Sequence, residues 1–383
     1  MPNDREEDWN DELAEEVSSE GIENLVVYSR DWTVETILRQ IEQDNIDLNP
    51  GFQRRNAWND SKRSKLIESL IIGVPVPEIV LAEDISKRRS FIVIDGKQRL
   101  LALAGFADPV RYRSWDKAVL RGLGTRKDLN GSDFSSVRDA PDDSRQFLNA
   151  DIRCTVISNY KNNDVLYDIF YRLNTGSVPL SSQELRQVLN RGPFADFLIE
   201  STNKLLPLHA VLNLGAPDNR LRDAEILLRY IAFSIFGQRY GGNLTPFLDE
   251  SMATVNEGWN KYKPEVMRFF DELNYATTQL IDVFNVQHVG RKFANGKWES
   301  RFNRALYEVE AFYFGKLPPG ALGSVKSEDV VGEFEEFCGH SPEFLDSIET
   351  STKNLQRYRR RYELFQGFVN SVFGTSINCV PLP

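Results

Sequence analysis

Cysteine and histidine are scarce in this chain of 383 residues, and long hydrophobic runs are absent. Cys154, Cys338 and Cys379 are odd in number and far apart, so they predict neither a disulfide framework nor a CxxC metal site. No apolar run approaches the roughly 18 residues of a membrane span, and the Met1 end is acidic where a secretory signal is basic and then apolar. We therefore expect a cytoplasmic protein with buried, reduced thiols and no membrane contact.

Charge is distributed unevenly along the chain. Residues 1–50 hold 15 acidic residues against three arginines, whereas residues 51–383 hold 43 basic and 41 acidic residues. The net charge of -10 is therefore a property of the N-terminal end. We expect residues 1–24 to be a disordered, solvated leader. The alternative is an acidic segment that competes with nucleic acid for a basic groove elsewhere in the chain.

The spacing of apolar residues predicts an α+β domain followed by an all-α domain. Strand-like runs lie at 25–28, 78–82, 91–94 and 151–157, with a charged hairpin at 86–89 between the second and the third. Predicted helix caps are Thr33, then Asn59 or Asp60, and a capping box at 181–184. Residues 107–150 are rich in Gly, Asp, Ser and Arg with weak periodicity, which predicts a long surface excursion. From about residue 193 onward the spacing is helical nearly throughout. The predicted domains are therefore 25–192 and 193–383.

The most specific feature is a strand, turn and helix around residues 91–106. The strand runs into Asp95 and Gly96, and helical spacing resumes directly afterwards. A carboxylate at a strand end, a glycine that allows close backbone approach, and Lys97 and Arg99 at the start of a helix would bring cations and free N–H groups together. This arrangement suits a phosphate, although an ordinary strand-Asp-Gly turn has the same sequence.

Several further motifs accompany this turn in a fixed order. They are Phe52-Gln53-Arg54, Trp58, Leu66-Ile67-Glu68-Ser69, Pro75-x-Pro77, Asp95-Gly96-Lys97-Gln98-Arg99-Leu100, Arg172-Leu173-Asn174-Thr175-Gly176, Leu180-x-x-x-Glu184-Leu185-Arg186 and Arg222-Asp223-x-Glu225-x-x-Leu228-Arg229. Their order and spacing resemble the N-terminal domain of GmrSD-type restriction endonucleases from about residue 30 to 235. The resemblance implies a ParB/sulfiredoxin-like fold whose Asp-Gly-Gln-Gln-Arg motif supports nucleoside triphosphate binding and hydrolysis in modification-dependent phage restriction.

The resemblance also implies roles for the residues of the turn. Asp95 would hold Mg²⁺ or orient water, and Gly96 would permit close approach of phosphate. Gln98 and Arg99 would bind the phosphates, so that Asp95, Gln98 and Arg99 form the implied catalytic set. Lys97 replaces the usual glutamine. A lysine retains the attraction for phosphate but cannot position water through an amide, so nucleotide binding follows more directly than hydrolysis.

Four residues outside the turn complete the implied nucleotide pocket. Gln53 and Arg54 follow their own glycine turn and would line the same pocket, and Arg172 and Asn174 end a predicted helix with their polar groups exposed. Arg172 and Asn174 have an alternative role as helix-capping and solvent-contacting residues.

A histidine-dependent nuclease is the other activity that the resemblance brings into question, because fused relatives carry such a domain after the helical region. None of His209, His288 and His340 stands in a recognisable nuclease motif. His340 could share a metal with Cys338, but ordinary solvent or core positions explain both residues. We expect that this chain does not encode a histidine-metal nuclease.

Two basic clusters are candidates for nucleic-acid contact. In the first, Arg357, Arg359, Arg360 and Arg361 alternate with tyrosines, a composition that pairs phosphate attraction with base stacking. The alternative is a packed helix with a solvated basic face. The second cluster comprises Arg291, Lys292, Lys297, Arg301 and Arg304.

Together these features predict a nucleotide-dependent sensor or regulatory component of a bacterial anti-phage restriction system. It would bind and hydrolyse a nucleoside triphosphate with Mg²⁺, and act on foreign or modified DNA with a partner nuclease or another defence subunit. Two alternatives stay open. The chain could cut DNA itself, since some ParB-like domains are nucleases, or it could be a non-catalytic module that binds DNA or protein. Homo-oligomerisation is compatible with each of them.

The uneven charge generates the first prediction. Deleting residues 1–24, which hold ten acidic residues and Arg5, should tighten DNA binding at low salt and have less effect at high salt, because salt screens the charges. Titrating DNA into both proteins at two ionic strengths measures this. Equal binding at low salt would leave the segment as a solvated leader only.

Overall fold

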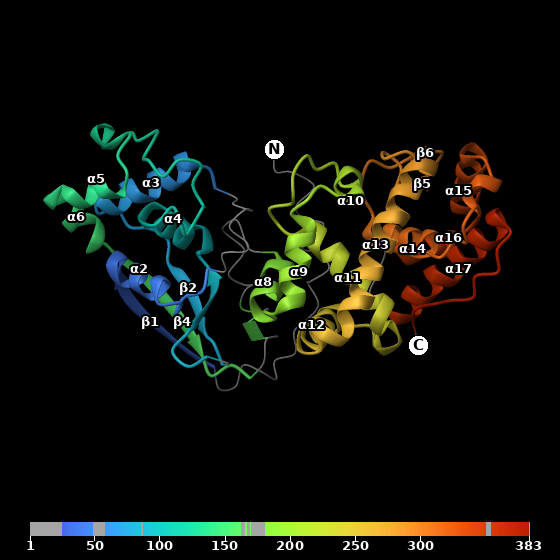
Figure 1. The fold of residues 1–383 in the computed structure, drawn as a ribbon, viewed down its shortest axis with the longest axis horizontal. Coiled ribbons are helices and arrows are strands. Elements are labelled where there is room, and N and C mark those ends of the chain that lie inside the picture. Colours follow the sequence, from blue (N-terminus) through green and yellow to red (C-terminus); the bar gives the residue numbers. More distant parts are fainter. Residues whose placement is uncertain are drawn as a thin grey trace. The chain divides into compact units, whose positions relative to one another are not determined.

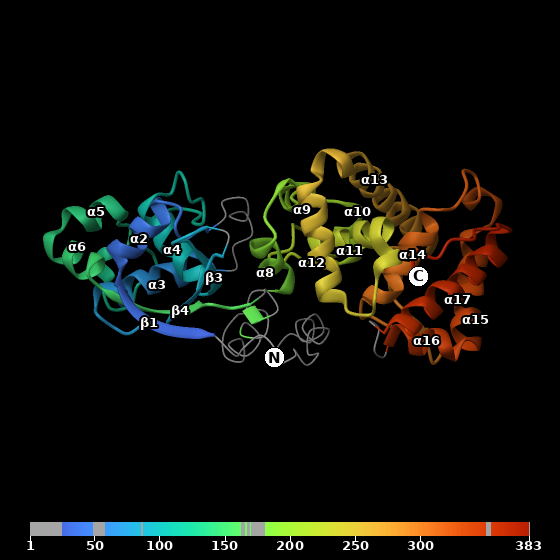
Figure 2. The same cartoon turned by 90° about the horizontal axis from the view of Figure 1, so that it is seen from below.

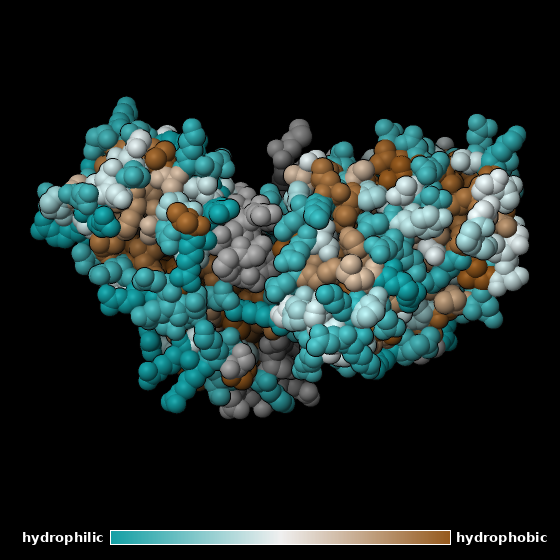
Figure 3. Space-filling model, viewed as in Figure 1, coloured by the Kyte–Doolittle hydropathy of each residue, from teal (hydrophilic) through white to brown (hydrophobic). Residues whose placement is uncertain are grey.

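The computed structural model describes residues 25–48, 58–85, 87–161, 165–166, 169, 181–349 and 354–382. The chain divides into two compact units between Leu189 and Asn190 (Figure 1). The first unit combines a sheet with helices, and the second is almost entirely helical, so the predicted α+β class is confirmed. None of the described helices has the length and apolar character that a membrane span needs. In the view of Figure 3, hydrophilic residues lie beside hydrophobic patches on the described surface.

A four-stranded sheet organises the first unit. Its spatial order is β1 (Val26–Thr33), β4 (Asp151–Ser158), β2 (Ile79–Glu83) and β3 (Phe91–Asp95). The two outer pairs, β1 with β4 and β2 with β3, are antiparallel, and the central pair is parallel. The sheet contains each of the four predicted strand-like runs, and the charged hairpin joins β2 to β3 as the sequence predicts.

Alternating side chains of these strands enter two separate cores. Ile79 and Leu81 face helices α2 (Val34–Glu42), α3 (Asp60–Ile71), α4 (Lys97–Ala107) and α6 (Pro141–Leu148). Val80 and Ala82 face the other way, toward α8 (Ser182–Leu189). Figure 2 shows α2, α3 and α4 on one side of β1 and β4. Helices therefore cover both faces of the sheet.

Local capping signals in the sequence place three of these helices correctly. The Thr33 hydroxyl accepts from Thr36 N (3.1 Å) at the start of α2, and the Asn59 side chain accepts from Lys62 N (2.9 Å) at the start of α3. Ser181 and Glu184 form the predicted capping box, because Ser181 Oγ accepts from Glu184 N (3.1 Å) and a Glu184 carboxylate oxygen accepts from Ser181 N (2.6 Å).

The prediction that residues 107–150 form a surface excursion is wrong. This segment holds η4 (Lys127–Leu129), α5 (Phe134–Asp139) and α6, and it contributes Trp115, Leu120 and Phe147 to the larger core. Its periodicity is weak because most of it is irregular backbone that packs onto other elements. Helix α3 supplies the partners that hold this backbone in place.

The polar face of α3 carries Asp60, Ser64 and Glu68, one helical turn apart. Asp60 accepts from the backbone N–H groups of residues 116 and 117 (3.1 and 3.0 Å), and Ser64 Oγ accepts from Arg121 N (3.0 Å). Glu68 Oε1 accepts from the N–H groups of residues 125 and 126 (2.9 and 2.7 Å). Three side chains of one helix thus replace the regular ladder that this irregular segment lacks.

Asp60 is the more deeply buried of the two carboxylates on this face, with 2% of the residue exposed. Burial by itself raises the pKa of its carboxyl group, but the two backbone N–H groups, Arg63 and Arg121 together lower the pKa below its usual value. The carboxylate consequently stays ionised in the native state. Its contribution to stability is present above the unfolded-state pKa and is lost as the pH falls through the lowered pKa.

The second unit is built from helices with an aromatic core. Its elements are α9 (Pro193–Thr202), α10 (Pro207–Val211), α11 (Arg222–Phe236), η5 (Gly237–Arg239), α12 (Leu244–Glu257), α13 (Trp259–Phe284), β5 (Phe293–Ala294), β6 (Lys297–Trp298), α14 (Arg304–Phe314), η6 (Leu322–Ser324), α15 (Ser327–His340), α16 (Pro342–Glu349) and α17 (Leu355–Phe373). Every residue of α14 is buried, which makes it the central helix. The short β5–β6 hairpin is the departure from the predicted all-α domain.

Close packing of the irregular segment against α4 generates a stability prediction. A methyl group on Gly105 would overlap Ser114 Oγ and lie 2.8 Å from the Tyr112 carbonyl oxygen. Gly105→Ala should therefore lower the free energy of unfolding of the first unit by about 1 to 3 kcal/mol, the usual cost of overpacking.

Gly124→Ala is the matched control, because a methyl group there would meet nothing within 4 Å. It should change the free energy of unfolding by less than about 1 kcal/mol. Urea denaturation of the two variants provides the comparison. Equal stabilities would show that the segment does not pack on α4 as described.

Candidate functional site

The turn between β3 and α4 requires a glycine. Gly96 has a φ of +94°, in the left-handed region that side chains rarely adopt. A Cβ at this position would also lie 3.0 Å from Ile79 Cγ1 and 3.3 Å from Ile79 Cα on the neighbouring strand. The backbone of the turn thus lies directly against β2. The role of Gly96 in the approach of a phosphate stays a prediction, because the close neighbour observed here is the protein's own strand.

Helix α4 begins at this turn without a side-chain cap among the residues that the structure describes. Its first turn contains no acidic residue and does contain Lys97 and Arg99, both of which are largely buried. The N–H groups of a first turn carry partial positive charge, and these two cations add to it. The start of α4 is therefore an electropositive point at the end of a strand.

The Arg99 guanidinium brings Asp95 and β2 together. Its Nη2 donates to Asp95 Oδ2 (2.6 Å) and to the Glu78 carbonyl oxygen (2.9 Å). The side chain of Arg99 is 9% exposed and that of Asp95 is 25% exposed. Two residues of the predicted catalytic set thus form an ion pair with each other.

One polar atom of the Arg99 side chain remains without a hydrogen bond in the described structure. Its Nε is buried and has no partner, although buried N–H groups almost always have one. An unpaired guanidinium N–H in low dielectric costs free energy that an incoming anionic oxygen would recover. This unpaired donor makes the turn a candidate ligand site, although Arg361 Nε in the helical core also has no hydrogen-bond partner.

Sequence reasoning did not identify the polar residues beside this turn. Glu78 lies next to Ile79, and its carboxylate accepts from Thr155 Oγ1 (2.8 Å) on β4. Arg153, which is also on β4, pairs with Asp31 of β1 (3.0 Å). These contacts join strands that lie far apart in sequence, so no local motif could reveal them.

The other predicted pocket residues are distributed as follows. Gln98 is half-buried in the first turn of α4. Gln53, Arg54, Arg172 and Asn174 lie outside the described residues, so their positions stay predictions. Among the described residues, no group of three or more His, Cys, Asp or Glu side chains is arranged to hold a metal ion.

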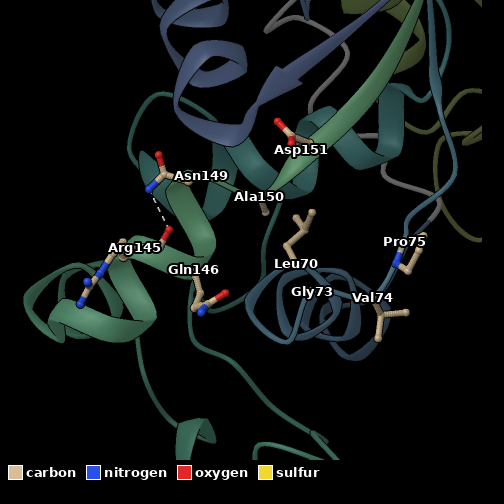
Figure 4. Close-up of a pocket in the computed structure, with 9 residues that line it drawn as sticks. All are labelled: Leu70, Gly73, Val74, Pro75, Arg145, Gln146, Asn149, Ala150 and Asp151. Atoms are coloured by element: carbon tan, nitrogen blue, oxygen red, sulfur yellow. Dashed lines mark hydrogen bonds between the residues drawn. The ribbon is translucent and has the colours of Figure 1, made fainter.

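A cleft of about 660 Å³ lies elsewhere in the first unit (Figure 4). It is formed by the end of α3, the end of α6 and the start of β4, and its lining residues are Leu70, Gly73, Val74, Pro75, Arg145, Gln146, Asn149, Ala150 and Asp151. In Figure 4 the Arg145 guanidinium points away from Leu70, and its Nη2 donates to Asp142 (2.6 Å). None of the predicted site residues lines this cleft.

The arginines predicted to contact nucleic acid occupy different environments on α17. Arg361 is 0% exposed and lies 3.5 Å from Glu308 and 3.9 Å from the centre of the Tyr358 ring. The prediction is therefore wrong for Arg361, which stabilises the helical core. Arg359 is exposed.

The two remaining arginines of α17 form surface ion pairs. Arg357 lies 3.2 Å from Asp346, and Arg360 lies 2.5 Å from Glu343. The hydrogen bonds from Arg360 to Glu343 raise the pKa of that guanidinium. Both side chains remain partly exposed, so a phosphate would compete with these acids for them.

The second basic cluster is partly buried as well. Arg304 donates to Glu225 (2.9 Å), and Arg291 donates to the Val211 carbonyl oxygen (3.0 Å). Neither guanidinium lies on the surface, since both residues are less than a tenth exposed. Arg291 and Arg304 are therefore not available for contact with nucleic acid.

His209 has partners on both ring nitrogens. Its Nε2 lies 2.9 Å from Asp223 Oδ2, and its Nδ1 accepts from Leu206 N (2.8 Å). His288 stacks on Trp298, with ring centres 4.3 Å apart. These contacts give both histidines structural roles.

Comparison with known proteins produced one match. The family described as "GmrSD restriction endonuclease, N-terminal domain" matches residues 34–189. This span runs from the first residue of α2 to the last residue of α8 and includes the Asp95 turn. It ends before the motif on α11. Neither a curated protein nor a solved structure matches the chain significantly.

The contrast within α17 generates a prediction for two neighbouring positions. Arg361→Ala should lower the free energy of unfolding by about 3 to 5 kcal/mol, because it removes a buried cation that pairs with the buried Glu308 carboxylate. Arg359→Ala should change it by less than about 0.5 kcal/mol, because that side chain is exposed. Chemical denaturation of both variants measures the difference, and a neutral Arg361→Ala would contradict the buried pair.

Proposed function

Because residues 34–189 form a GmrSD restriction endonuclease N-terminal domain, we infer that the chain is a component of a GmrSD-like antiviral restriction system. Within that system we propose that it binds a nucleoside triphosphate at the turn from Asp95 to Arg99. The observation that carries this proposal is the buried Arg99 Nε, which has no hydrogen-bond partner at an uncapped helix start. Phosphate oxygens can accept hydrogen bonds from Arg99 Nε and from the backbone N–H groups at the start of α4.

The geometry of the turn supports a specific mode of phosphate binding. Gly96 lets the turn lie against β2, and the backbone N–H groups at the start of α4 would donate to a phosphate. Arg99 would donate its free Nε to a phosphate oxygen, and Lys97 would add a second positive charge. The phosphates would then compete with Asp95 for the guanidinium, since Arg99 already donates to that carboxylate.

Mg²⁺ fits this site only in combination with the nucleotide. Asp95 is the carboxylate of the described turn that would hold it, and phosphate oxygens and water would complete the octahedral shell, as is usual for this ion. When bound, Mg²⁺ would neutralise charge on the phosphates. Asp95 would therefore hold Mg²⁺ together with the phosphates of the bound nucleotide.

We also propose that this site hydrolyses the bound nucleotide. Gln98 provides an amide that can orient water from the first turn of α4, where it is half-buried. Lys97 stands at the position of the usual glutamine and supplies charge in place of an amide. We propose that Gln98 takes the water-positioning role and that Arg99 stabilises charge that develops on the phosphates.

The target and partner of the chain follow from the restriction system. We propose that it acts on foreign or modified DNA together with a nuclease or another defence subunit. The exposed Arg359, with Arg357 and Arg360, offers a local basic surface for DNA backbone contact. Any such contact would be sensitive to salt, because the phosphate charges dominate it.

Arg99→Lys tests the binding site directly. A lysine retains the charge but loses the planar array of donors, so nucleotide affinity should fall ten- to a hundredfold, or about 1.5 to 3 kcal/mol. Arg88→Lys is the matched control, because Arg88 is exposed on the β2–β3 hairpin. Titrating a panel of nucleoside triphosphates with Mg²⁺ into the full chain measures the affinities. Equal affinities in all three proteins would place the phosphates elsewhere.

Asp95→Asn separates binding from turnover in the same panel. The amide keeps the shape of the side chain but removes the negative charge that would hold Mg²⁺, so phosphate release should be lost while nucleotide binding is retained. Wild-type rates of phosphate release in this variant would remove Asp95 from the mechanism. Metal-dependent nicking of DNA by the purified wild type without nucleotide would favour the nuclease alternative.

A further inference from the structure

The two edges of the sheet differ in how they are covered. At the β3 edge, Ile46 forms a parallel bridge with Phe91, and Phe91 N donates to the Asn45 carbonyl oxygen (2.7 Å). At the other edge lies β1, an eight-residue strand whose only backbone partner among the described residues is β4. An uncovered row of backbone N–H and C=O groups is a template for pairing with another strand.

Several of the usual protections of an edge strand are missing from β1. Its sequence, VVYSRDWT, contains neither proline nor lysine, and its register with β4 is continuous over all eight residues. Val26 and Val27 are 48% and 55% exposed. The charged side chains pair within the sheet, because Asp31 binds Arg153 and the Arg30 guanidinium lies 5.0 Å from the centre of the Tyr28 ring.

The hydrogen-bonding phase of β1 identifies the residues whose backbone groups point outward. Val34 N donates to the Ala150 carbonyl oxygen (3.0 Å), in the same register as the β1–β4 ladder. Backbone groups alternate in direction along an antiparallel strand. The even-numbered residues of β1 therefore bond to β4, and Val27, Ser29 and Asp31 direct their N–H and C=O groups away from the sheet.

We propose that β1 is a dimerisation edge that pairs antiparallel with β1 of a second copy of this chain, with Ser29 opposite Ser29 on the two-fold axis. In this register the outward groups of Ser29 face each other, and Val27 faces Asp31 on each side. About six backbone hydrogen bonds result, two for each hydrogen-bonded pair. The two four-stranded sheets become one continuous sheet.

Side-chain chemistry selects this register. With Ser29 on the axis, Tyr28 of one copy lies opposite Arg30 of the other in a close, non-hydrogen-bonded pair, which extends the contact between cation and ring that each strand already makes. A shift that places Arg30 on the axis sets two arginines directly opposite each other, which is unfavourable. The sequence of β1 is thus complementary to itself when Ser29 lies on the axis.

Sedimentation of the full chain over a range of concentrations tests the proposal. The wild type should reach twice the 43.9 kDa mass of the chain. Ser29→Pro should remain monomeric, because proline removes an outward N–H that β4 does not use. Ser29→Ala loses the same hydroxyl but keeps the N–H, so it should dimerise like the wild type.

A cross-linking experiment covers the case in which Ser29→Pro fails to fold. In a Cys379→Ser background, which removes the exposed native thiol, Ser29→Cys should cross-link to a dimer with a short bismaleimide. Val110→Cys, at another exposed position, should not. A wild type that stays monomeric, a Ser29→Pro variant that dimerises like the wild type, or equal cross-linking at both positions would overturn the proposal.

Discussion

The site depends on one buried guanidinium that must be neutralised and hydrogen-bonded. Arg99 joins the end of β3 to the start of β2, because its Nη2 donates to Asp95 and to the Glu78 carbonyl oxygen. A buried cation without these partners would be strongly destabilising. Nε of the same side chain is buried without a partner, and we propose that it donates to an anion. Gly96 completes the arrangement by letting the turn pack against Ile79 of β2.

Buried charge has a comparable role in other parts of each unit. In the first unit Asp60 holds irregular backbone against α3, and its carboxylate is compensated by N–H groups and two arginines. In the second unit Glu308 pairs with Arg229 and Arg361 between α11, α14 and α17. Arginines that look in sequence like a nucleic-acid surface are thereby used to join helices. Arg359 and Arg360 are the exposed arginines of this run.

The sequence predicted those features that depend on local chemistry. The caps at Thr33 and Asn59 and the Ser181–Glu184 box follow from residues three positions apart, and the structure confirms each of them. The buried segment 107–150 was not predictable in this way, because its partners lie on α3, some 57 residues earlier in the chain. Arg361 could not be distinguished from its neighbours, since burial depends on how α17 packs. The pair between Asp95 and Arg99 is local in sequence, but the same spacing also suits two groups that face a ligand.

The central claim is that phosphates bind at the start of α4. Hydrogen exchange of the full chain with and without Mg²⁺ and inorganic tripolyphosphate tests it most directly, because this probe does not depend on the identity of the base. The account predicts slower exchange of the backbone amides of residues 96–99 when the probe binds, since those N–H groups would donate to phosphate oxygens. Unchanged exchange in these residues, with protection confined to other segments of the chain, would contradict it.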